Sequence, residues 1–331
     1  MDIAQLGFSA LSATLKAASE ATRLRLLTLI AEAELTVTDL TAILRQSQPR
    51  LSRHLRLLAA AGLIERHREG SWAFFRLGDQ GGAAEIARAL VARLDPNDPI
   101  IARDRERLAA VRAARSAAAQ NYFRRHAAEW DGIRRLHIAD AAVEAAMVKA
   151  LEGPPIRSLL DLGTGTGRML ELFAGKIERG LGLDLSLDML ALARARLDRA
   201  GLKHCSVRYG DIYGSALPAA SFDVVIIHQV LHFLDDSARA IREAARLLRP
   251  GGRLLVVDFA PHDLEFLRDE HAHRRLGFAA ETVQQWLEAA GLDLIAQETL
   301  PPGPEGKIAV SLWLGRDPRM ALAPPATREV A

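Results

Sequence analysis

Acidic residues and glycines stand at the ends of short apolar runs in the second half of the sequence. The first run is followed by Gly163-Thr-Gly-Thr-Gly167, the second has Asp184 at its carboxyl end, and the third ends in Asp211. Alternate glycines let a backbone turn sharply and approach a ligand closely. An acid at the end of a strand can accept hydrogen bonds from both ribose hydroxyls, and another can accept one from an adenine amino group. The spacing predicts a nucleotide-type cofactor site.

Histidines follow the next two apolar runs. Residues 222–229 end in His228 and Gln229, and His232 comes shortly after. Because imidazole can accept a proton near neutral pH, His228 and His232 are the candidates for catalysis, with structural hydrogen bonding as the alternative. Three more histidines follow the fifth run: His262, His271 and His273. They lack an obvious fourth ligand, so no metal site is predicted.

A basic segment with different chemistry lies in the first third of the chain. Between Asp39 and Glu65 there are four arginines and no acid. A helix that begins near Pro49 would place its leucines on one face and its polar side chains on the other, where they could reach phosphates and base edges. With two positions of a following hairpin, the DNA-binding candidates are Gln48, Arg50, Ser52, Arg53, His54, Arg56, Arg66 and Arg68. A solvated surface is the alternative for the helix alone.

The elements around this segment occur in a recognisable order. A helix is predicted up to about Ala33, and a short second helix over 39–44 with Thr38 as its cap. After the basic helix, two strands over 63–68 and 71–77 form a hairpin whose tip carries Arg66, His67 and Arg68. Helix, turn, basic helix and basic hairpin in this order favour DNA binding.

The length and composition indicate two folded units. A chain of 331 residues is longer than one ordinary domain. Prolines in Asp95-Pro-Asn-Asp-Pro99 interrupt the helical pattern, and a helix-forming segment follows. We predict a DNA-binding and dimerisation domain over 1–95, a helical linker over 96–118, a catalytic domain over 119–316 and a disordered tail over 317–331.

Composition also limits the kind of protein. No apolar run approaches the ~20 residues needed to span a bilayer, and no signal peptide precedes the first helix, so we expect a cytoplasmic protein with no membrane partner. The chain has one cysteine. An intramolecular disulfide and a thiolate metal cluster within one chain are thereby excluded.

The first third resembles the ArsR/SmtB family of winged helix-turn-helix repressors. The resemblance rests on TLKAASEATRLRLLTLI, ELTVTDLTAIL and SQPRLSRHLRLLAAAGLIERHREGSWAFFRL. It implies an α+β domain, a homodimer and an inverted-repeat operator on double-stranded DNA. Arsenic-sensing members carry cysteines at the positions of Thr36 and Thr38, so this chain lacks their metal site.

Residues from about 120 to 315 resemble a class I S-adenosylmethionine-dependent methyltransferase. The motifs are DLGTGTGRM, GLDLSLDML, GDIY, FDVVIIHQVLHFLDD and RLLRPGGRLLVVDF. The resemblance implies an α/β Rossmann-like seven-stranded sheet whose last two strands, over 294–300 and 307–314, run antiparallel. Tyr122, Phe123 and Trp130 precede the first strand of this domain, and we predict that they form a lid over the cofactor. The cofactor residues that the resemblance implies are Asp161, Gly163, Thr164, Gly165, Gly167, Asp184, Leu185, Met189, Asp211, Ile212, His228 and Gln229. An NAD enzyme is the competing interpretation, which the GTGTG spacing disfavours.

Three functions fit these two halves. The first is a transcriptional repressor whose methyltransferase domain senses S-adenosylmethionine or S-adenosylhomocysteine. The second is an active methyltransferase of a small-molecule acceptor, whose winged helix autoregulates its operon; one cysteine argues against arsenite as that acceptor. In the third, the first domain serves only to dimerise the enzyme. The helix with arginines and no acid argues against this third function.

Overall fold

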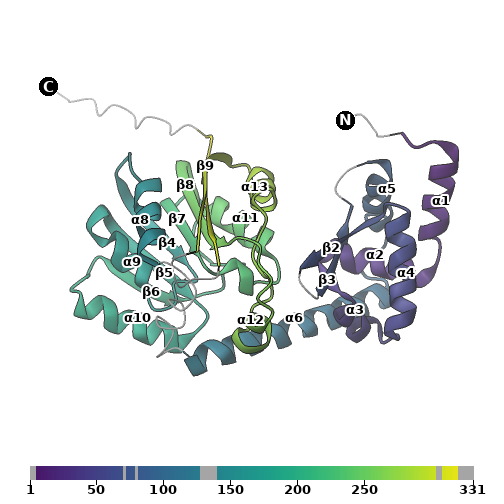
Figure 1. Cartoon of the computed structure of the whole chain (residues 1–331), viewed down its shortest axis with the longest axis horizontal. Coiled ribbons are helices and arrows are strands. Elements are labelled where there is room, and N and C mark those ends of the chain that lie inside the picture. Colours follow the sequence, from purple (N-terminus) through teal and green to yellow (C-terminus); the bar gives the residue numbers. More distant parts are fainter. Residues whose placement is uncertain (1–4, 70–71, 79–80, 127–139, 303–307, 320–331) are drawn as a thin grey trace. The chain divides into compact units, whose positions relative to one another are not determined.

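The computed structural model describes residues 5–69, 72–78, 81–126, 140–302 and 308–319. The chain divides into two compact units, Met1–Ala118 and Ala119–Ala331 (Figure 1). Among the described residues, no helix is both long and apolar enough to cross a membrane. The predicted tail over 317–331 falls mostly outside the described residues.

The first unit packs helices on a small antiparallel sheet. Its elements are α1 (Phe8–Ala18), α2 (Ala21–Glu32), β1 (Leu35–Thr36), α3 (Val37–Leu44), α4 (Gln48–Ala60), β2 (Ile64–Glu69), β3 (Trp72–Leu77) and α5 (Gly82–Val91). The strands lie in the order β1-β3-β2. Leu51, Leu55 and Leu58 of α4 are buried against leucines of α2 and α3, because their spacing places them on one helix face. The helix-turn-helix and hairpin agree with the prediction.

The cap of α3 is Thr36, so the prediction of Thr38 was wrong. The Thr36 hydroxyl accepts a hydrogen bond from the Asp39 backbone N–H at 3.2 Å, and the Asp39 carboxylate accepts one from the Thr36 N–H at 2.8 Å. This reciprocal capping box starts the helix two residues earlier than expected. The ELTVTDL stretch therefore uses its first threonine hydroxyl to begin a helix.

Helix α6 (Pro99–His126) is longer than the predicted linker helix. Its first turn is capped by Asp98, whose carboxylate accepts the Ile100 N–H at 2.8 Å. Asp104 pairs with Arg25 of α2 at 2.6 Å, and Arg112 donates to the Glu32 carbonyl at 2.8 Å. The helix continues for 28 residues, past the predicted linker end at 118.

The second unit is a seven-stranded sheet covered by helices on both faces (Figure 1). Its strands are β4 (Ile156–Leu162), β5 (Ile177–Asp184), β6 (Cys205–Tyr209), β7 (Phe222–His228), β8 (Leu248–Phe259), β9 (Asp293–Leu300) and β10 (Val310–Arg316). Its helices are α8 (Asp140–Ala150), α9 (Arg168–Phe173), α10 (Leu187–Arg199), α11 (Ser237–Leu247), α12 (Phe266–His271) and α13 (Ala280–Ala289), with short 3₁₀ turns η2 (Ala174–Lys176) and η3 (Leu231–Phe233).

The strand order is β6-β5-β4-β7-β8-β10-β9, and the five strands from β6 to β8 are parallel. Consecutive residues of these strands point to opposite faces: Leu159 and Ile226 enter one core and Leu160 and Val225 the other. After β4 the chain adds β5 and β6 on one side of the sheet, and after β7 it adds β8 on the other side. The carboxyl ends of β4 and β7 thus form the switch point at which open α/β sheets bind ligands.

The last two strands pair antiparallel, as the resemblance implied. Strand β10 also runs antiparallel to β8, so β9 has the same direction as the five parallel strands. The predicted strand over 307–314 is displaced to Val310–Arg316, and Lys307 lies outside the described residues. The fold is therefore the predicted two-domain arrangement of an α+β helix-turn-helix unit and an α/β Rossmann-like unit.

Candidate functional sites

The glycine loop follows β4 at the switch point. Gly163, Gly165 and Gly167 have positive φ angles of 76°, 51° and 80°, which L side chains rarely adopt. The N–H groups of Gly163 and Thr164 donate to the Leu183 carbonyl of β5 at 2.8 and 2.9 Å. A Cβ on Gly163 would lie 2.4 Å from a methyl carbon of Val230. The loop is therefore hydrogen-bonded to β5 and packs closely against the segment after β7.

Asp161 supports the glycine loop from inside. Its side chain is buried, and its carboxylate accepts the Thr164 hydroxyl at 2.6 Å. Thr164 in turn fills the space over Gly182, where a Cβ would lie 2.6 Å from the threonine oxygen. These contacts fix the start of the loop in one conformation.

Asp184 lies at the carboxyl end of β5. Its two carboxylate oxygens accept the N–H groups of Gly165 and Ser186, each at 2.8 Å. Burial raises the pKa of Asp184, and these backbone N–H groups partly oppose the shift. Ser186 caps α10 by accepting the Met189 N–H at 3.3 Å, and the Met189 side chain is buried. Leu185, which lies between Asp184 and Ser186, is half-buried.

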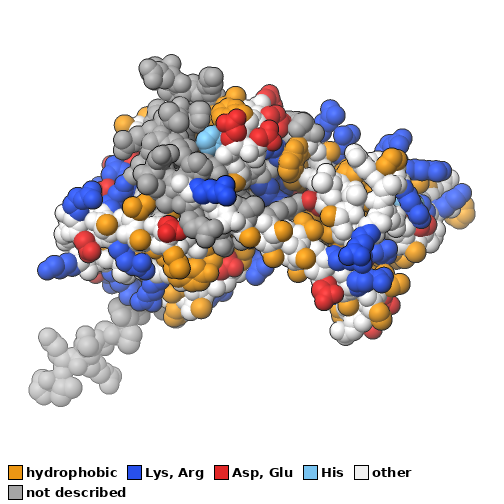
Figure 2. All heavy atoms as spheres, turned by 90° about the horizontal axis from the view of Figure 1, so that it is seen from below, with side chains coloured by type: hydrophobic (Ala, Val, Ile, Leu, Met, Phe, Trp, Pro, Cys, Tyr) orange, Lys and Arg blue, Asp and Glu red, His pale blue; other side chains and the backbone are white. Residues whose placement is uncertain are grey.

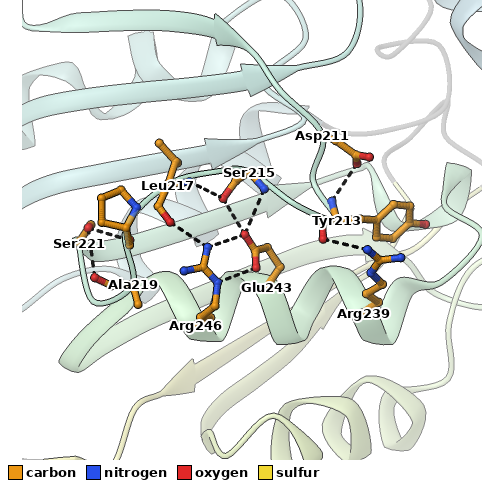
Figure 3. Close-up of polar contacts among 10 residues, drawn as sticks. Asp211, Tyr213, Ser215, Leu217, Ala219, Ser221, Arg239, Glu243 and Arg246 are labelled. Atoms are coloured by element: carbon orange, nitrogen blue, oxygen red, sulfur yellow. Dashed lines mark hydrogen bonds and ion pairs between the residues drawn. The ribbon is translucent and has the colours of Figure 1, made fainter.

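Asp211 follows β6 at a distance of two residues. The strand ends at Tyr209, so the prediction that the third run ends in Asp211 was wrong by two residues. Asp211 is exposed and accepts the Tyr213 N–H at 2.9 Å, which turns the chain after Gly210 (Figure 3). Ile212 is buried. Because β4, β5 and β6 are adjacent and parallel, Asp161, Asp184 and Asp211 lie along the same edge of the sheet.

His228 and Gln229 occupy the end of β7, and both are buried. Gln229 has a φ of 54°, an unusual angle for a residue with a side chain, and its N–H donates to the Val257 carbonyl at 2.7 Å. Its buried Nε2 has no hydrogen-bond partner within the described ranges. This strained residue at the switch point brings an amide donor to the strand edge.

His232 is the centre of a buried polar group. Its Nδ1 lies 2.7 Å from Asp258 Oδ1, and the exposed fractions of the two residues are 2% and 0%. Its carbonyl accepts the N–H groups of Arg274 and Arg275 at 2.9 and 3.1 Å. The ring packs on Phe259 and His273, with centroids at 4.6 and 4.3 Å. His232 thus joins the end of β7 to the segment after β8.

Asp258 did not enter the sequence prediction. It stands at the end of the apolar run Leu254–Val257, which is the position that singled out Asp184. The presence of an acid at the end of an apolar run, which singled out the second and third strands, would have found Asp258 on the fifth.

The other histidines have structural surroundings. The His262 Nδ1 accepts the Leu264 N–H at 3.3 Å, and burial lowers the pKa of His262 to about 4. His273 stacks on Phe259 with an interplanar angle of 7°, and His271 lies edge-on to Phe266. Within the described residues, no three His, Cys, Asp or Glu side chains are grouped so that they could hold a metal ion.

Part of the predicted lid can be placed. The Phe123 ring of α6 meets Phe233 edge-on at 4.8 Å, next to His232. Trp130 lies outside the described residues.

The candidate DNA contacts lie on α4 and β2. Gln48, Arg50, Arg53 and Arg56 of α4 are exposed, whereas Ser52 is half-buried. His54 is half-buried, its Nδ1 lies 3.5 Å from the Glu20 carboxylate, and burial lowers its pKa. His54 therefore packs against the start of α2. Figure 2 shows clusters of basic side chains over the first unit.

Arg66, His67 and Arg68 lie within β2 and not at the hairpin tip. Arg66 pairs with Phe75, and Arg68 with Ala73. All three are exposed. The prediction misplaced them because β2 continues to Glu69.

Comparisons with known proteins support both halves separately. A family model described as "Bacterial regulatory protein, arsR family" matches residues 20–66, and one described as "Methyltransferase domain" matches residues 160–256. The methyltransferase YcgJ of Bacillus subtilis, itself uncharacterised, is 30% identical over 118 residues, which are 35% of this chain and 47% of that protein.

Two relatives with named activities match over similar stretches. The arsenite methyltransferase of Aquipseudomonas alcaligenes is 38% identical over 110 residues, 30% of this chain and 32% of that protein. The malonyl-[acyl-carrier protein] O-methyltransferase of Methylococcus capsulatus is 30% identical over 174 residues, 50% of this chain and 62% of that protein. This chain therefore spans less than two thirds of the length of each of these relatives.

One solved structure shows the fold of the second unit. A chain in the structure described as "Complex between the Haloferax volcanii Trm112 methyltransferase activator and the putative methyltransferase" matches with a TM-score of 0.50 and 22% identity. The match covers 60% of this chain and 98% of that chain.

Proposed function

We propose that this chain, which joins an arsR-type helix-turn-helix region to a class I methyltransferase domain, is a DNA-binding repressor that senses S-adenosylmethionine or S-adenosylhomocysteine. The observation that carries the proposal is the pairing of two sites in one chain. Exposed arginines of α4 form one, and the glycine loop with Asp184 and Asp211 forms the other. Thr36 serves as the cap of α3, and the chain has only one cysteine. Both facts agree with a regulator whose signal is a ligand bound elsewhere and not a metal held by thiolates.

The cofactor assignment follows the chemistry of the strand ends. We propose that Asp184 accepts the ribose hydroxyls, that Asp211 and Ile212 contact adenine, and that the loop over 163–167 takes the methionine end. The two oxygens of Asp184 accept the N–H groups of Gly165 and Ser186, and each oxygen retains lone pairs for ribose hydroxyls. S-adenosylmethionine supplies an activated methyl group when bound, and the chain supplies alignment of the acceptor.

Homodimerisation is part of the proposal. Phe8, Leu11 and Leu15 lie on one face of α1 with exposed fractions of 89%, 38% and 48%. Apolar side chains at this spacing gain stability when a second copy covers them. Two copies would present two α4 helices to half-sites about one helical turn apart on an inverted repeat.

Operator binding by the purified protein tests the regulator proposal. Affinity for the chain's own promoter region is measured at fixed salt without ligand, with S-adenosylmethionine and with S-adenosylhomocysteine, since phosphate contacts make affinity depend on salt. We expect one ligand to change the affinity about tenfold, which is about 1.4 kcal/mol of coupling. Equal affinity in all three conditions would rule out ligand sensing.

Active methyl transfer is the second candidate, and the buried pair of His232 and Asp258 favours it. The Asp258 carboxylate orients the His232 imidazole at the strand edge. An imidazole held in this way can take a proton from the substrate that receives the methyl group. The named activities of the relatives include O-methyl transfer. Formation of S-adenosylhomocysteine in the presence of hydroxy and carboxylic acid acceptors tests this candidate; a rate equal to that without acceptor would contradict it for those classes.

A further inference from the structure

The segment between β6 and β7 is held by helix α11. This segment, residues 210–221, contains Asp211 and Ile212, the residues proposed to contact adenine. Figure 3 shows its polar contacts with three side chains of α11: Arg239, Glu243 and Arg246. Ala216 and Ala220 in the segment have positive φ angles of 54° and 51°. Residues with side chains adopt such angles at a cost, so neighbouring contacts must hold the segment in this shape.

Glu243 makes the central contact. Its Oε1 accepts the Ser215 hydroxyl at 2.6 Å and the Ser215 N–H at 3.2 Å. Arg246 donates to both carboxylate oxygens, at 2.8 and 2.7 Å, and also to the Leu217 carbonyl at 2.9 Å. The hydrogen bonds from Arg246 are the main reason that the pKa of Glu243 falls to about 2. The carboxylate is therefore ionised at neutral pH and acts as a fixed acceptor for the segment.

Tyr213 provides a second contact, closer to Asp211. Its hydroxyl accepts the Asp236 N–H at 2.9 Å, and its carbonyl accepts Arg239 Nη2 at 3.3 Å. The guanidinium of Arg239 also lies 5.1 Å from the centre of the Tyr213 ring. The Tyr213 N–H donates to Asp211, so the conformation of the Asp211 turn depends on a residue that α11 holds.

We infer that Glu243 is a positioning residue for recognition of the adenine base. It holds Ser215 and, with Arg246, the segment up to Leu217, while Arg239 holds Tyr213, so that the Asp211 carboxylate is already placed for the adenine 6-amino group. The cost of ordering the segment is then met during folding and not during binding. This inference rests on the proposed function, because that proposal places the adenosyl group at this edge of the sheet.

The test compares two ligands that differ at the adenine 6-position. Calorimetry on the full chain gives dissociation constants for S-adenosylhomocysteine and for S-inosylhomocysteine, in which an oxygen replaces the amino group. We expect Glu243→Gln to weaken S-adenosylhomocysteine about tenfold and S-inosylhomocysteine much less, so that the preference for adenine shrinks. Glu288→Gln on α13 removes the same charge from an exposed site and should preserve the preference.

The possible results distinguish a failure of the Glu243 inference from a failure of the proposed cofactor binding. Ser215→Ala, which removes one hydroxyl donor to Glu243, should reduce the preference about threefold and decides the question if Glu243→Gln does not fold. An unchanged preference in the folded variants overturns the inference while leaving cofactor binding in place. If the unaltered chain binds neither ligand, the cofactor proposal itself fails.

Discussion

At the scale of single residues, the buried pair of His232 and Asp258 holds two segments together. Replacing Asp258 with Ala would leave the His232 ring without its acceptor in a site closed to water. We expect the free energy of unfolding of the second unit to fall by about 3 kcal/mol, the usual cost of removing one partner of a buried pair. Urea denaturation followed by tryptophan fluorescence measures it.

A double-mutant cycle with His232→Phe provides the control for that measurement. If the two side chains act mainly on each other, the double variant loses clearly less stability than the sum of the single variants. Additive losses would show that Asp258 stabilises the fold only through the hydrogen bonds that its carboxylate accepts from the backbone N–H groups of His232 and Phe259.

His262 should give the protein a pH-dependent stability. Its pKa is lowered from 6.5 to about 4 by burial, so the unfolded chain binds a proton more readily than the folded chain. Stability is therefore lost as the pH falls from about 6.5 towards 4, and this contribution levels off below 4. His262→Leu should flatten the dependence in this window. Thermal melts at several pH values test it, with His204→Leu at an exposed position as the control; equal slopes in both variants would contradict it.

At the scale of elements, the first turn of α3 depends on one of two neighbouring threonines. Thr36 accepts the Asp39 N–H, whereas Thr38 is exposed within the helix. Thr36→Ala should lower the free energy of unfolding of the first unit by about 1 kcal/mol, and Thr38→Ala by much less. Chemical denaturation of both variants makes the comparison. Equal losses would mean that the capping box does not stabilise α3.

Helix α4 should carry the affinity for DNA. Removing a side chain that contacts phosphate weakens binding and lowers the slope of log affinity against log salt by about 1. We expect this for Arg50→Ala and Arg53→Ala in titrations of the operator at several salt concentrations. Arg103→Ala, exposed on α6, should leave both quantities unchanged. A slope that does not change in the α4 variants would move the contact surface elsewhere.

The elements differ in how well the sequence predicted them. Strand β4 was predicted to the residue, because an apolar run bounded by Pro155 and Gly163 leaves little choice. The Asp211 turn and the two-residue strand β1 were not, since each depends on contacts with distant residues: β1 exists only by pairing with Phe74 and Phe75 of β3. Asp258 stands at the end of an apolar run and could have been found from the sequence, whereas the role of Glu243 becomes visible only when α11 is placed against residues 210–221.

At the scale of the whole molecule, assembly and DNA binding should fail together. Phe8→Glu would place a charge in the apolar face of α1 that we propose a second copy covers. We expect the variant to be monomeric in light scattering and to bind the operator at least about tenfold more weakly, because one half-site contact is lost. Leu192→Glu, on the partly exposed surface of α10, is the matched control. A dimeric Phe8→Glu variant would place the interface on another face.

The position of β10 bears on the order in which the second unit can form during synthesis. Strand β9 is made before β10 but meets the sheet only through it, since β10 lies between β8 and β9. Until residues 310–316 have left the ribosome, the edge of β8 stays open and β9 has no ladder to join. Pairing over such long sequence separations is slow. The nascent chain should therefore expose an unpaired edge of β8 until β10 is made, and chaperones would protect it from aggregation during that interval.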